Sequence, residues 1–345
     1  MSKSIRETIK NKYDKKQQQV YDTLMRKKDA VYSKVPAIKD IDNNIQLLGI
    51  KYNKMILLSG YPSDKAINEL SSKISCLKNE KERLLTASGY SPDYLEPVYS
   101  CKLCKDTGQI ENGNVLESCS CYKQYLIDLL YKGSNLRLIG RENFEFFDES
   151  FYPDAANESK YGIKKSPREH ILGIKERCLK FIENFDSPEE RNLYFCGPTG
   201  IGKTFMASCI AAEILNRGKT VLYQTAPILF DTISEYKLKA FREEAFDDNC
   251  YKNIFDVELL IIDDLGTESR SSARYAELLN ILNIRQLNNL SSPSKIIIST
   301  NIEPDKLYEY YTERVASRII GCFNFFKFAG EDIRRIKKQL HSGTV

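Results

Sequence analysis

The fold of this chain is decided by residues 197–204, which read Gly197-Pro198-Thr199-Gly200-Ile201-Gly202-Lys203-Thr204. They fit the pattern G-x-x-x-x-G-K-[ST], in which backbone N–H groups surround phosphates, the lysine reaches the terminal phosphates and the hydroxyl holds Mg²⁺. Residues 193–196 predict a buried strand before the loop, and residues 205–215 predict an apolar helix after it. The eight residues are therefore the predicted phosphate contacts, at a helix N-terminus that favours anions. The alternative is a glycine-rich turn with an incidental lysine.

Two carboxylates follow a second buried strand. Residues 259–262 form a continuous apolar run that ends in Asp263 and Asp264. A strand this apolar is typical of a parallel sheet covered on both faces, whose carboxyl edge carries the ligand site. We expect Asp263 to hold Mg²⁺ together with Thr204, and Asp264 to polarise the attacking water. A helix cap or turn is the alternative for such a pair.

Further polar groups follow along the chain. Residues 295–300 predict another strand, and Asn301 after it could orient the water or the γ-phosphate, with Thr300 as the second choice. Arg314 and Arg318 are four residues apart on one predicted helix face, and a second basic pair follows residue 330. Phosphoryl transfer needs cations over the equatorial oxygens, but surface arginines are more often solvated or paired with carboxylates.

The N-terminal quarter of the chain is helical and basic. Residues 4–35 predict a helix that ends before Pro36, and apolar seams over residues 38–55 and 67–84, separated by Gly60-Tyr61-Pro62, predict an antiparallel helical hairpin. Residues 1–90 hold 18 Lys and Arg against 10 Asp and Glu, whereas the other residues hold 33 against 37. This basic region either binds an acidic partner or is the solvated face of a structural stalk.

Four of the ten cysteines form a cluster in the sequence. Cys101 and Cys104 are separated by two residues, and Cys119 and Cys121 by one, across a predicted turn at Asn112-Gly113. Four thiolates in a closed tetrahedral site favour structural Zn²⁺, and redox disulfides or coincidental thiols are the alternatives.

The totals fit a soluble protein of two or three domains. The chain has 345 residues, 42% of them hydrophobic. It contains no apolar run of the roughly 20 residues that a membrane helix needs, and its N-terminus lacks the apolar core of a signal peptide. We therefore expect a cytoplasmic protein with reduced thiols and no membrane partner.

Together these motifs resemble AAA+ ATPases, and among them the bacterial replicative helicase loaders of the DnaC/DnaI type. The resemblance extends over residues 95–338 and rests on the cysteine spacing with Asp106-Thr107-Gly108, the phosphate loop, and the segments LLIIDDLG, ISTN and ERVASRI. It implies an α/β fold: a P-loop AAA+ parallel five-stranded sheet flanked by helices, preceded by an N-terminal helical hairpin and a small zinc module of four cysteines. The implied cofactors are ATP, Mg²⁺ and Zn²⁺.

The resemblance also implies roles for single residues. Asn301 would be the first sensor, Arg318 a finger acting on the ATP of a neighbouring subunit, and Arg334 a sensor of the γ-phosphate in its own subunit. The implied partners are the hexameric replicative DNA helicase (DnaB-type), single-stranded DNA and further copies of the chain. Basic residues beside the aromatic side chains of Phe230 and Tyr236 are our choice for DNA contact, since such groups suit backbone charge and base stacking: Lys237, Lys239 and Arg242.

Three domains and three functions follow from this reading. We expect residues 1–90 to form a helical or coiled-coil hairpin that binds the helicase, residues 91–140 the zinc-binding module with a connecting helix, and residues 141–345 the AAA+ ATPase domain. The predicted function is an ATPase that loads the helicase onto single-stranded DNA. The alternatives are a transposase-helper ATPase and a nucleotide-switched scaffold with little turnover.

Overall fold

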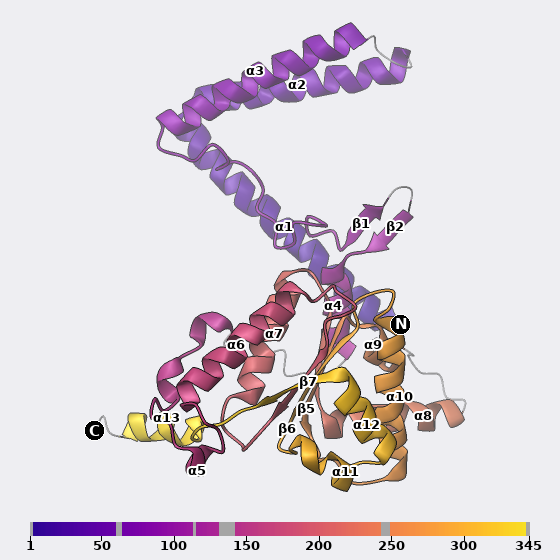
Figure 1. The fold of residues 1–345 in the computed structure, drawn as a ribbon. Helices are drawn as coiled ribbons and strands as arrows, with labels where there is room; N and C mark the ends of the chain where they lie inside the picture. Colours follow the sequence, from indigo (N-terminus) through magenta and orange to yellow (C-terminus); the bar gives the residue numbers. More distant parts are fainter. Residues whose placement is uncertain (1–2, 60–63, 113–114, 131–141, 243–248, 343–345) are drawn as a thin grey trace. The chain divides into compact units, whose positions relative to one another are not determined.

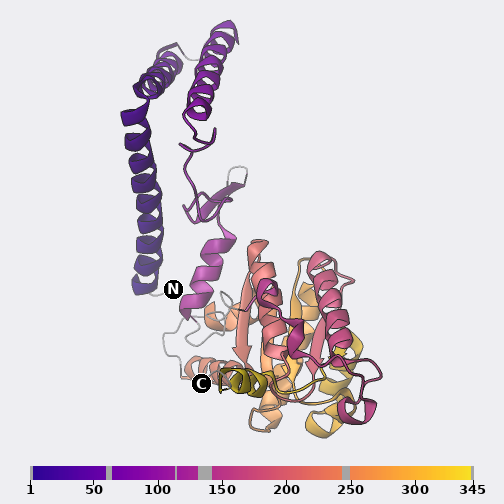
Figure 2. The same ribbon diagram turned by 90° about the vertical axis from the view of Figure 1, so that its left-hand side faces the viewer.

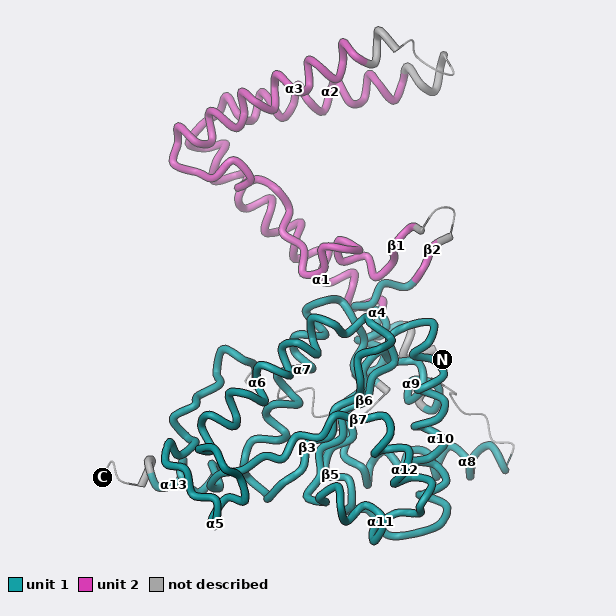
Figure 3. The backbone as a smooth tube through the Cα atoms, in the orientation of Figure 1, with its two compact units in different colours: residues 1–9, 118–345 teal, residues 10–117 magenta. Residues whose placement is uncertain are grey.

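The computed structural model describes residues 3–59, 64–112, 115–130, 142–242 and 249–342. The chain divides into two compact units, residues 10–117 and residues 1–9 with 118–345, which are coloured separately in Figure 3. The predicted domain boundaries after residues 90 and 140 stay predictions, and the second lies outside the described residues. Among the described helices, none is long and apolar enough to cross a lipid bilayer.

The first three helices have the predicted extents. Figure 2 shows α1 (Lys3–Lys34) as one continuous helix, which ends before Pro36 as expected because proline disfavours a helical residue before it. The helices α2 (Pro36–Ser59) and α3 (Asp64–Ala87) lie side by side and antiparallel (Figure 1), which confirms the predicted hairpin. The predicted break at Gly60-Tyr61-Pro62 lies outside the described residues.

A small apolar cluster holds the base of this hairpin. Val31, Ile38 and Leu85 are fully buried and pack with Leu95 of the following segment. Farther along the hairpin, the paired seam side chains of Ile45, Leu48, Ile74 and Leu77 are only half-buried. The hairpin therefore buries its apolar surface completely at its base and only partly along its length.

The cysteine region is built on a two-stranded sheet. β1 (Gln109–Asn112) and β2 (Val115–Ser118) pair, and α4 (Ser120–Leu130) begins directly after them. The predicted turn at Asn112-Gly113 lies partly outside the described residues.

The larger unit is organised around five parallel strands in the order β4-β5-β6-β3-β7. This parallel sheet flanked by helices, with the helical N-terminal region and a cysteine cluster, confirms the predicted α/β architecture. The strands are β3 (Asn192–Cys196), β4 (Val221–Thr225), β5 (Leu259–Leu265), β6 (Lys295–Thr300) and β7 (Phe323–Lys327).

Helices cover both faces of the sheet because its strands are apolar on both sides. Alternate residues of β5 belong to opposite cores: Leu259 and Ile261 pack with α6 and α7, and Leu260 and Ile262 with α8, α9, α10 and α12. The helices are α5 (Glu158–Tyr161), α6 (Pro167–Glu183), α7 (Lys203–Asn216), α8 (Ala226–Phe241), α9 (Asn249–Asp256), α10 (Ser272–Asn288), α11 (Leu307–Tyr310), α12 (Glu313–Cys322) and α13 (Ile333–Ser342). Short 3-10 turns are η2 (Phe144–Phe146), η3 (Glu149–Phe151) and η4 (Pro304–Lys306).

The order of the strands decides where the polar groups meet. β5, β6 and β3 are consecutive neighbours, and each is followed or ended by one of the predicted site segments. Since the strands are parallel, their carboxyl ends lie along one edge. That edge brings together the loop 197–204, Asp263 with Asp264, and Asn301.

Candidate functional site

The phosphate loop connects β3 to α7, and Lys203 is the first residue of that helix. Gly200 and Gly202 have φ values of 82° and 95°, in the left-handed region that favours glycine. A Cβ atom on Gly200 would lie 2.3 Å from Asp332 Oδ1, and one on Gly202 would lie 2.5 Å from the Tyr152 hydroxyl. The close approach of these neighbours therefore requires glycine at both positions.

Lys203 is held at the centre of the site. Its side chain is only 6% exposed, and Nζ donates to the carbonyl oxygens of Gly197 and Pro198, at 2.7 Å each, and to Asn301 Oδ1 at 2.8 Å. Burial lowers the pKa of Lys203, while the charges of Asp264 and Asp263 oppose that shift. A buried ammonium beside the first N–H groups of a helix fits a polyphosphate, because both groups are donors.

Asp263 lies beside the hydroxyl of the loop. The carboxylate is 2% exposed, and its Oδ2 accepts from Thr204 Oγ1 at 3.1 Å and from the Tyr223 hydroxyl at 3.0 Å. Its Oδ1 accepts from the N–H of Asp264 at 3.0 Å. Carboxylate and hydroxyl oxygens are hard ligands of the kind that Mg²⁺ takes, so Thr204 and Asp263 fit a magnesium site with the remaining positions left to water and phosphate.

Asp264 is turned out of the strand. The register of β5 against β6 shifts between Ile262 and Leu265, and Asp264 has a φ of 53° and an exposed side chain. Such a bulge re-aims a side chain at the end of a strand. Partial burial and the charge of Asp263 raise the pKa of Asp264, while Lys203 and Arg334 lower it. The carboxylate therefore interacts electrostatically with Lys203 of the loop and is exposed to solvent, and its role toward water stays a prediction.

Asn301 joins the same site from β6. It accepts from Lys203, and its Nδ2 lies 3.4 Å from Thr199 Oγ1. The alternative residue, Thr300, is fully buried and bound to backbone: its hydroxyl donates to Leu265 O and accepts from the N–H of Ile302. The geometry therefore favours Asn301 over Thr300 as a group that faces the loop.

The two predicted arginines are placed differently. Arg334 is exposed in the first turn of α13, and its charge acts on both Lys203 and Asp264. Arg318 donates to Gln286 Oε1 at 3.1 Å and lines a groove of about 800 Å³ between α10 and α12. The lining of that groove includes Arg314 and contains no residue of the phosphate loop. The structure thus brings Arg334 to the site of its own chain and does not bring Arg318 there.

Sequence reasoning missed three residues that contact the site. Tyr223 binds Asp263 from the middle of β4, Tyr152 donates to Ile201 O at 3.1 Å, and Asp332 packs against Gly200. Tyr152 belongs to the aromatic segment 143–153 and is buried in the core that includes α6 and α7. The patterns revealed only that these residues lie in a strand or near a turn, since hydroxyl partners depend on tertiary packing.

Two of the three basic residues chosen for DNA contact form ion pairs in this structure. Lys237 forms an ion pair with Glu277, and Lys239 forms one with Glu235. Tyr236 stacks on Tyr251, with ring centroids 4.1 Å apart. The DNA contact of this helix stays a prediction.

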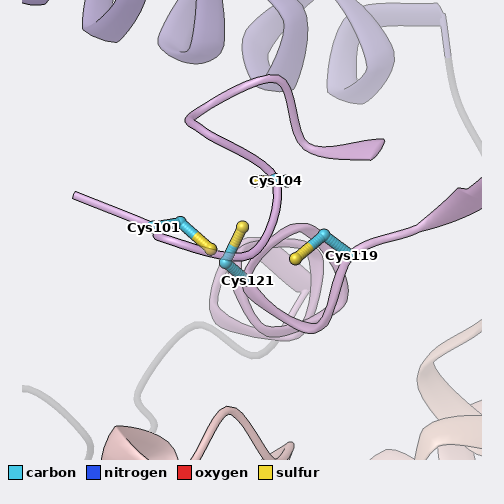
Figure 4. A group of neighbouring side chains, drawn as sticks. All are labelled: Cys101, Cys104, Cys119 and Cys121. Carbon is cyan, nitrogen blue, oxygen red and sulfur yellow. The ribbon is translucent and has the colours of Figure 1, made fainter. Parts of the chain in front are cut away.

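The four predicted zinc ligands come together. The sulfur atoms of Cys101, Cys104, Cys119 and Cys121 all lie within 4.8 Å of one another, and Cys104 and Cys119 are buried. Figure 4 shows these four residues as neighbours. A tetrahedral zinc with Zn–S bonds of about 2.3 Å requires sulfur atoms about 3.8 Å apart. The donor set and its spacing therefore fit Zn²⁺. The one-residue spacing of the second pair is accommodated because Cys119 ends the hairpin and Cys121 lies in the first turn of α4.

Comparison with known proteins also indicates a nucleotide-binding domain. Residues 169–313 match the family described as IstB-like ATP binding protein. This part of the chain is thus similar to the IstB-like ATP-binding proteins, and the replicative helicase loader DnaC is among the other proteins to which the chain is similar.

Two of the similar proteins have different described functions. The chain is 26% identical over 153 residues to a putative insertion sequence ATP-binding protein of Sinorhizobium fredii, covering 43% of this chain and 58% of the relative. It is 26% identical over 143 residues to the replicative helicase loader DnaC of Escherichia coli, covering 41% of this chain and 55% of the relative. The matches thus span somewhat more than half the length of these relatives. A crystal structure of the DnaC helicase loader is similar at 24% identity and a TM-score of 0.40, covering 55% of this chain and 98% of that one.

Proposed function

We propose that this protein is an ATP-dependent loader that binds the hexameric replicative DNA helicase and helps to place it on single-stranded DNA in the cytoplasm. One combination carries the proposal: an ATP-binding domain shared with DnaC stands in the same chain as a basic helical hairpin and a four-cysteine cluster. ATP hydrolysis at the nucleotide site would supply the energy, and the helical hairpin would bind the helicase.

The residues of the site support ATP hydrolysis. Mg²⁺, when bound with ATP at Thr204 and Asp263, supplies positive charge against the phosphate oxygens. Lys203 binds the terminal phosphates, and Asp264 accepts a proton from water. Asn301 orients that water.

The two arginines would divide the work between subunits. Arg334 neutralises the γ-phosphate within its own chain, where its charge already reaches Lys203. Arg318 lies in the groove beside α12 and would act on the ATP of a neighbouring copy, which makes turnover depend on assembly.

The helical hairpin offers a surface for the partner. A groove of about 450 Å³ runs along α2 and α3, and Leu47, Leu48 and Leu77 supply its apolar floor. Both charged residues of its lining are lysines, Lys51 and Lys73. A second copy of the chain would bring these lysines together, whereas a helix of the helicase with an apolar face and flanking carboxylates complements them.

The test is binding of the full chain to the purified replicative helicase of the same genome. We expect the pair Lys51→Glu and Lys73→Glu to weaken binding at least tenfold, because it reverses the charge at the rim. The pair Lys54→Glu and Lys78→Glu makes the same change of charge on exposed positions of the same helices that do not line the groove, and should leave the affinity within twofold. A chain that does not bind the helicase at all would refute the proposal.

A second candidate function is a transposase helper. It is favoured by the IstB-like match and by the relative from an insertion sequence, which is as similar as DnaC in percentage identity. Binding of the purified chain to a transposase from the same genome, with no affinity for the helicase, would decide for it. A scaffold with little turnover is a third alternative, and it would be favoured if ATP hydrolysis stayed negligible and unchanged by Lys203→Ala, with or without single-stranded DNA.

A further inference from the structure

A buried carboxylate lies beside the cysteine cluster and has no role in metal binding itself. Asp106 is fully buried and has a φ of 57°. Its Oδ2 accepts from the N–H of Ser100 at 2.7 Å, and its Oδ1 accepts from the N–H of Cys101 at 3.0 Å. The carboxylate therefore fixes the backbone at the first of the four cysteines.

The same residue is bound from the opposite side by helix α1. Lys16 Nζ lies 3.7 Å from Asp106 Oδ1, and Gln17 Nε2 donates to Asp106 O at 3.2 Å. A charge removed from water is costly unless it is paired and hydrogen-bonded, and the Asp106 carboxylate has both kinds of partner: two N–H groups of the loop and the Lys16 ammonium. The loop of the cysteines and the helix thus share one buried anion.

The loop around Asp106 is closed by local hydrogen bonds, and a metal bound by the cysteines would stabilise it further. Thr107 donates from its N–H and hydroxyl to Cys104 O, at 3.0 and 2.6 Å, and the N–H of Gly108 donates to Cys104 Sγ at 3.3 Å. Four thiolates around Zn²⁺ carry a net charge of −2, so the N–H groups and the Lys16 ammonium offset a local excess of negative charge. These hydrogen bonds, together with the contacts of Asp106, connect residues 101–108 to their surroundings.

The other end of α1 is anchored by different chemistry. Val31 packs in the apolar cluster with Leu85 and Leu95, and Lys27 lies over the ring of Tyr94 at 4.7 Å and donates to Tyr94 O. These contacts involve neither the cysteines nor Asp106. Helix α1 therefore has an apolar anchor near residues 27–34, whereas the polar contacts of Lys16 and Gln17 lie in its other half, which also buries the side chain of Tyr13.

We propose that Asp106 couples metal binding at the cysteine cluster to the anchoring of the Lys16 end of α1. The inference rests on the proposed zinc site. When zinc is bound, the loop holds Asp106 in place for Lys16 and Gln17, and when zinc is lost, this end of the helix is released while the Val31 end stays packed. Coupling of this kind is reciprocal, so loosening the helix must also weaken the binding of zinc.

Hydrogen exchange of the full chain, with zinc bound and after chelation, tests the first half of the coupling. We expect amides of residues 12–20 to exchange at least tenfold faster without zinc, together with residues 101–108, while residues 27–34 change less than threefold. If chelation changes the exchange rates of residues 12–20 and 27–34 by the same factor, or changes neither, the proposal is overturned.

Zinc affinity, measured by competition with a chromophoric chelator, tests the second half. Asp106→Asn should weaken zinc about 10- to 100-fold, because an amide can accept from only one of the two N–H groups and groups that orient metal ligands have effects of this size. Lys16→Met with Gln17→Met removes the two α1 partners of Asp106 and leaves the four cysteines unchanged. This double substitution should weaken the affinity for zinc several-fold. Glu111→Gln, an exposed carboxylate on β1, is the matched control and should leave it unchanged.

The outcomes separate this inference from the proposed zinc site. A chain that binds no zinc at all refutes both. A chain that binds zinc tightly, with an affinity unaffected by the two substitutions in α1 and by Asp106→Asn, refutes the coupling and leaves the zinc site standing.

Discussion

The phosphate loop and the cysteine cluster both gather ligand atoms, but they are supported in different ways. The strand that carries Asp263 is fully buried from Leu259 to Ile262, between two cores. The cysteine cluster stands on a two-stranded sheet, and nearby Leu103 and Leu116 are 67% and 59% exposed. The sheet therefore holds the residues of the phosphate loop and Asp263 in place, whereas we expect so small an element as the cysteine region to depend on a bound metal for its stability.

Removal of zinc tests this difference most strongly. Structural zinc sites contribute about 10 to 16 kcal/mol of apparent binding free energy, which is also folding free energy for the segment that holds them. We expect about one zinc per chain by metal analysis, and loss of structure over residues 95–125 after chelation, followed by hydrogen exchange. ATP binding, measured by titration of a fluorescent nucleotide, should stay within about twofold. Loss of both together would show that the two regions are not independent.

One predicted catalytic residue, Arg318, does not lie at the phosphate loop of its own chain. Arg318 lies in a groove apart from the loop of its own chain, so a preformed site would bind ATP alone and hydrolyse it only in an assembly. Arg318→Ala should leave ATP affinity nearly intact and lower turnover by about a thousandfold, the size of effect of arginine fingers. Arg314→Ala, in the same groove, is the control.

Mixing variants sharpens that test. Asp264→Asn subunits retain Arg318, and Arg318→Ala subunits retain Asp264, so a mixture should recover part of the activity if the finger acts between subunits. A mixture with no more activity than its two components would contradict the assignment.

The pH dependence tests whether Asp264 acts as the base. Because burial and Asp263 raise its pKa, the carboxylate is ionised only above that raised value, and turnover should fall as the pH drops through it. We expect the acid limb above the ordinary aspartate value of about 3.9. Asp264→Asn should reduce turnover about a hundredfold and remove this limb, measured as ATP hydrolysis against pH with saturating Mg²⁺.

A second substitution fixes the sign of that pH effect. Arg334 lowers the pKa of Asp264, so Arg334→Ala should move the acid limb to higher pH. A shift to lower pH would mean that another group controls the limb.

The sequence predicted the parts of the molecule that follow local rules. The loop 197–204 needs glycines because Asp332 and Tyr152 approach it, and a run such as 259–262 is apolar because both sides of the sheet are covered. Such constraints determine the residue type at single positions, so they can be recognised from one amino-acid sequence. The four cysteines were equally visible, since thiols at short spacing have few other uses.

What the sequence could not predict depends on contacts between distant segments. The outward turn of Asp264 comes from a bulge between β5 and β6, and Gln17, which binds Asp106 from α1, lies 89 positions away. No composition or periodicity encodes which hydroxyl or ammonium meets a given carboxylate. The pairing of Lys237 and Lys239 with glutamates was hidden for the same reason.

Tyr223 offers the smallest and most specific test of a preformed magnesium site. Its hydroxyl and that of Thr204 share Asp263 Oδ2, so the tyrosine positions the carboxylate and takes no part in the chemistry itself. Tyr223→Phe keeps the buried ring and removes one hydrogen bond to a charged group, which should weaken Mg²⁺ about tenfold in the presence of ATP. At saturating Mg²⁺, turnover should recover to within about threefold. Tyr194→Phe removes a buried hydroxyl on β3, in the same sheet, that donates to Ile302 O, and it should leave the Mg²⁺ dependence unchanged. If both substitutions shift the Mg²⁺ dependence equally, the effect comes from sheet stability and not from the position of Asp263.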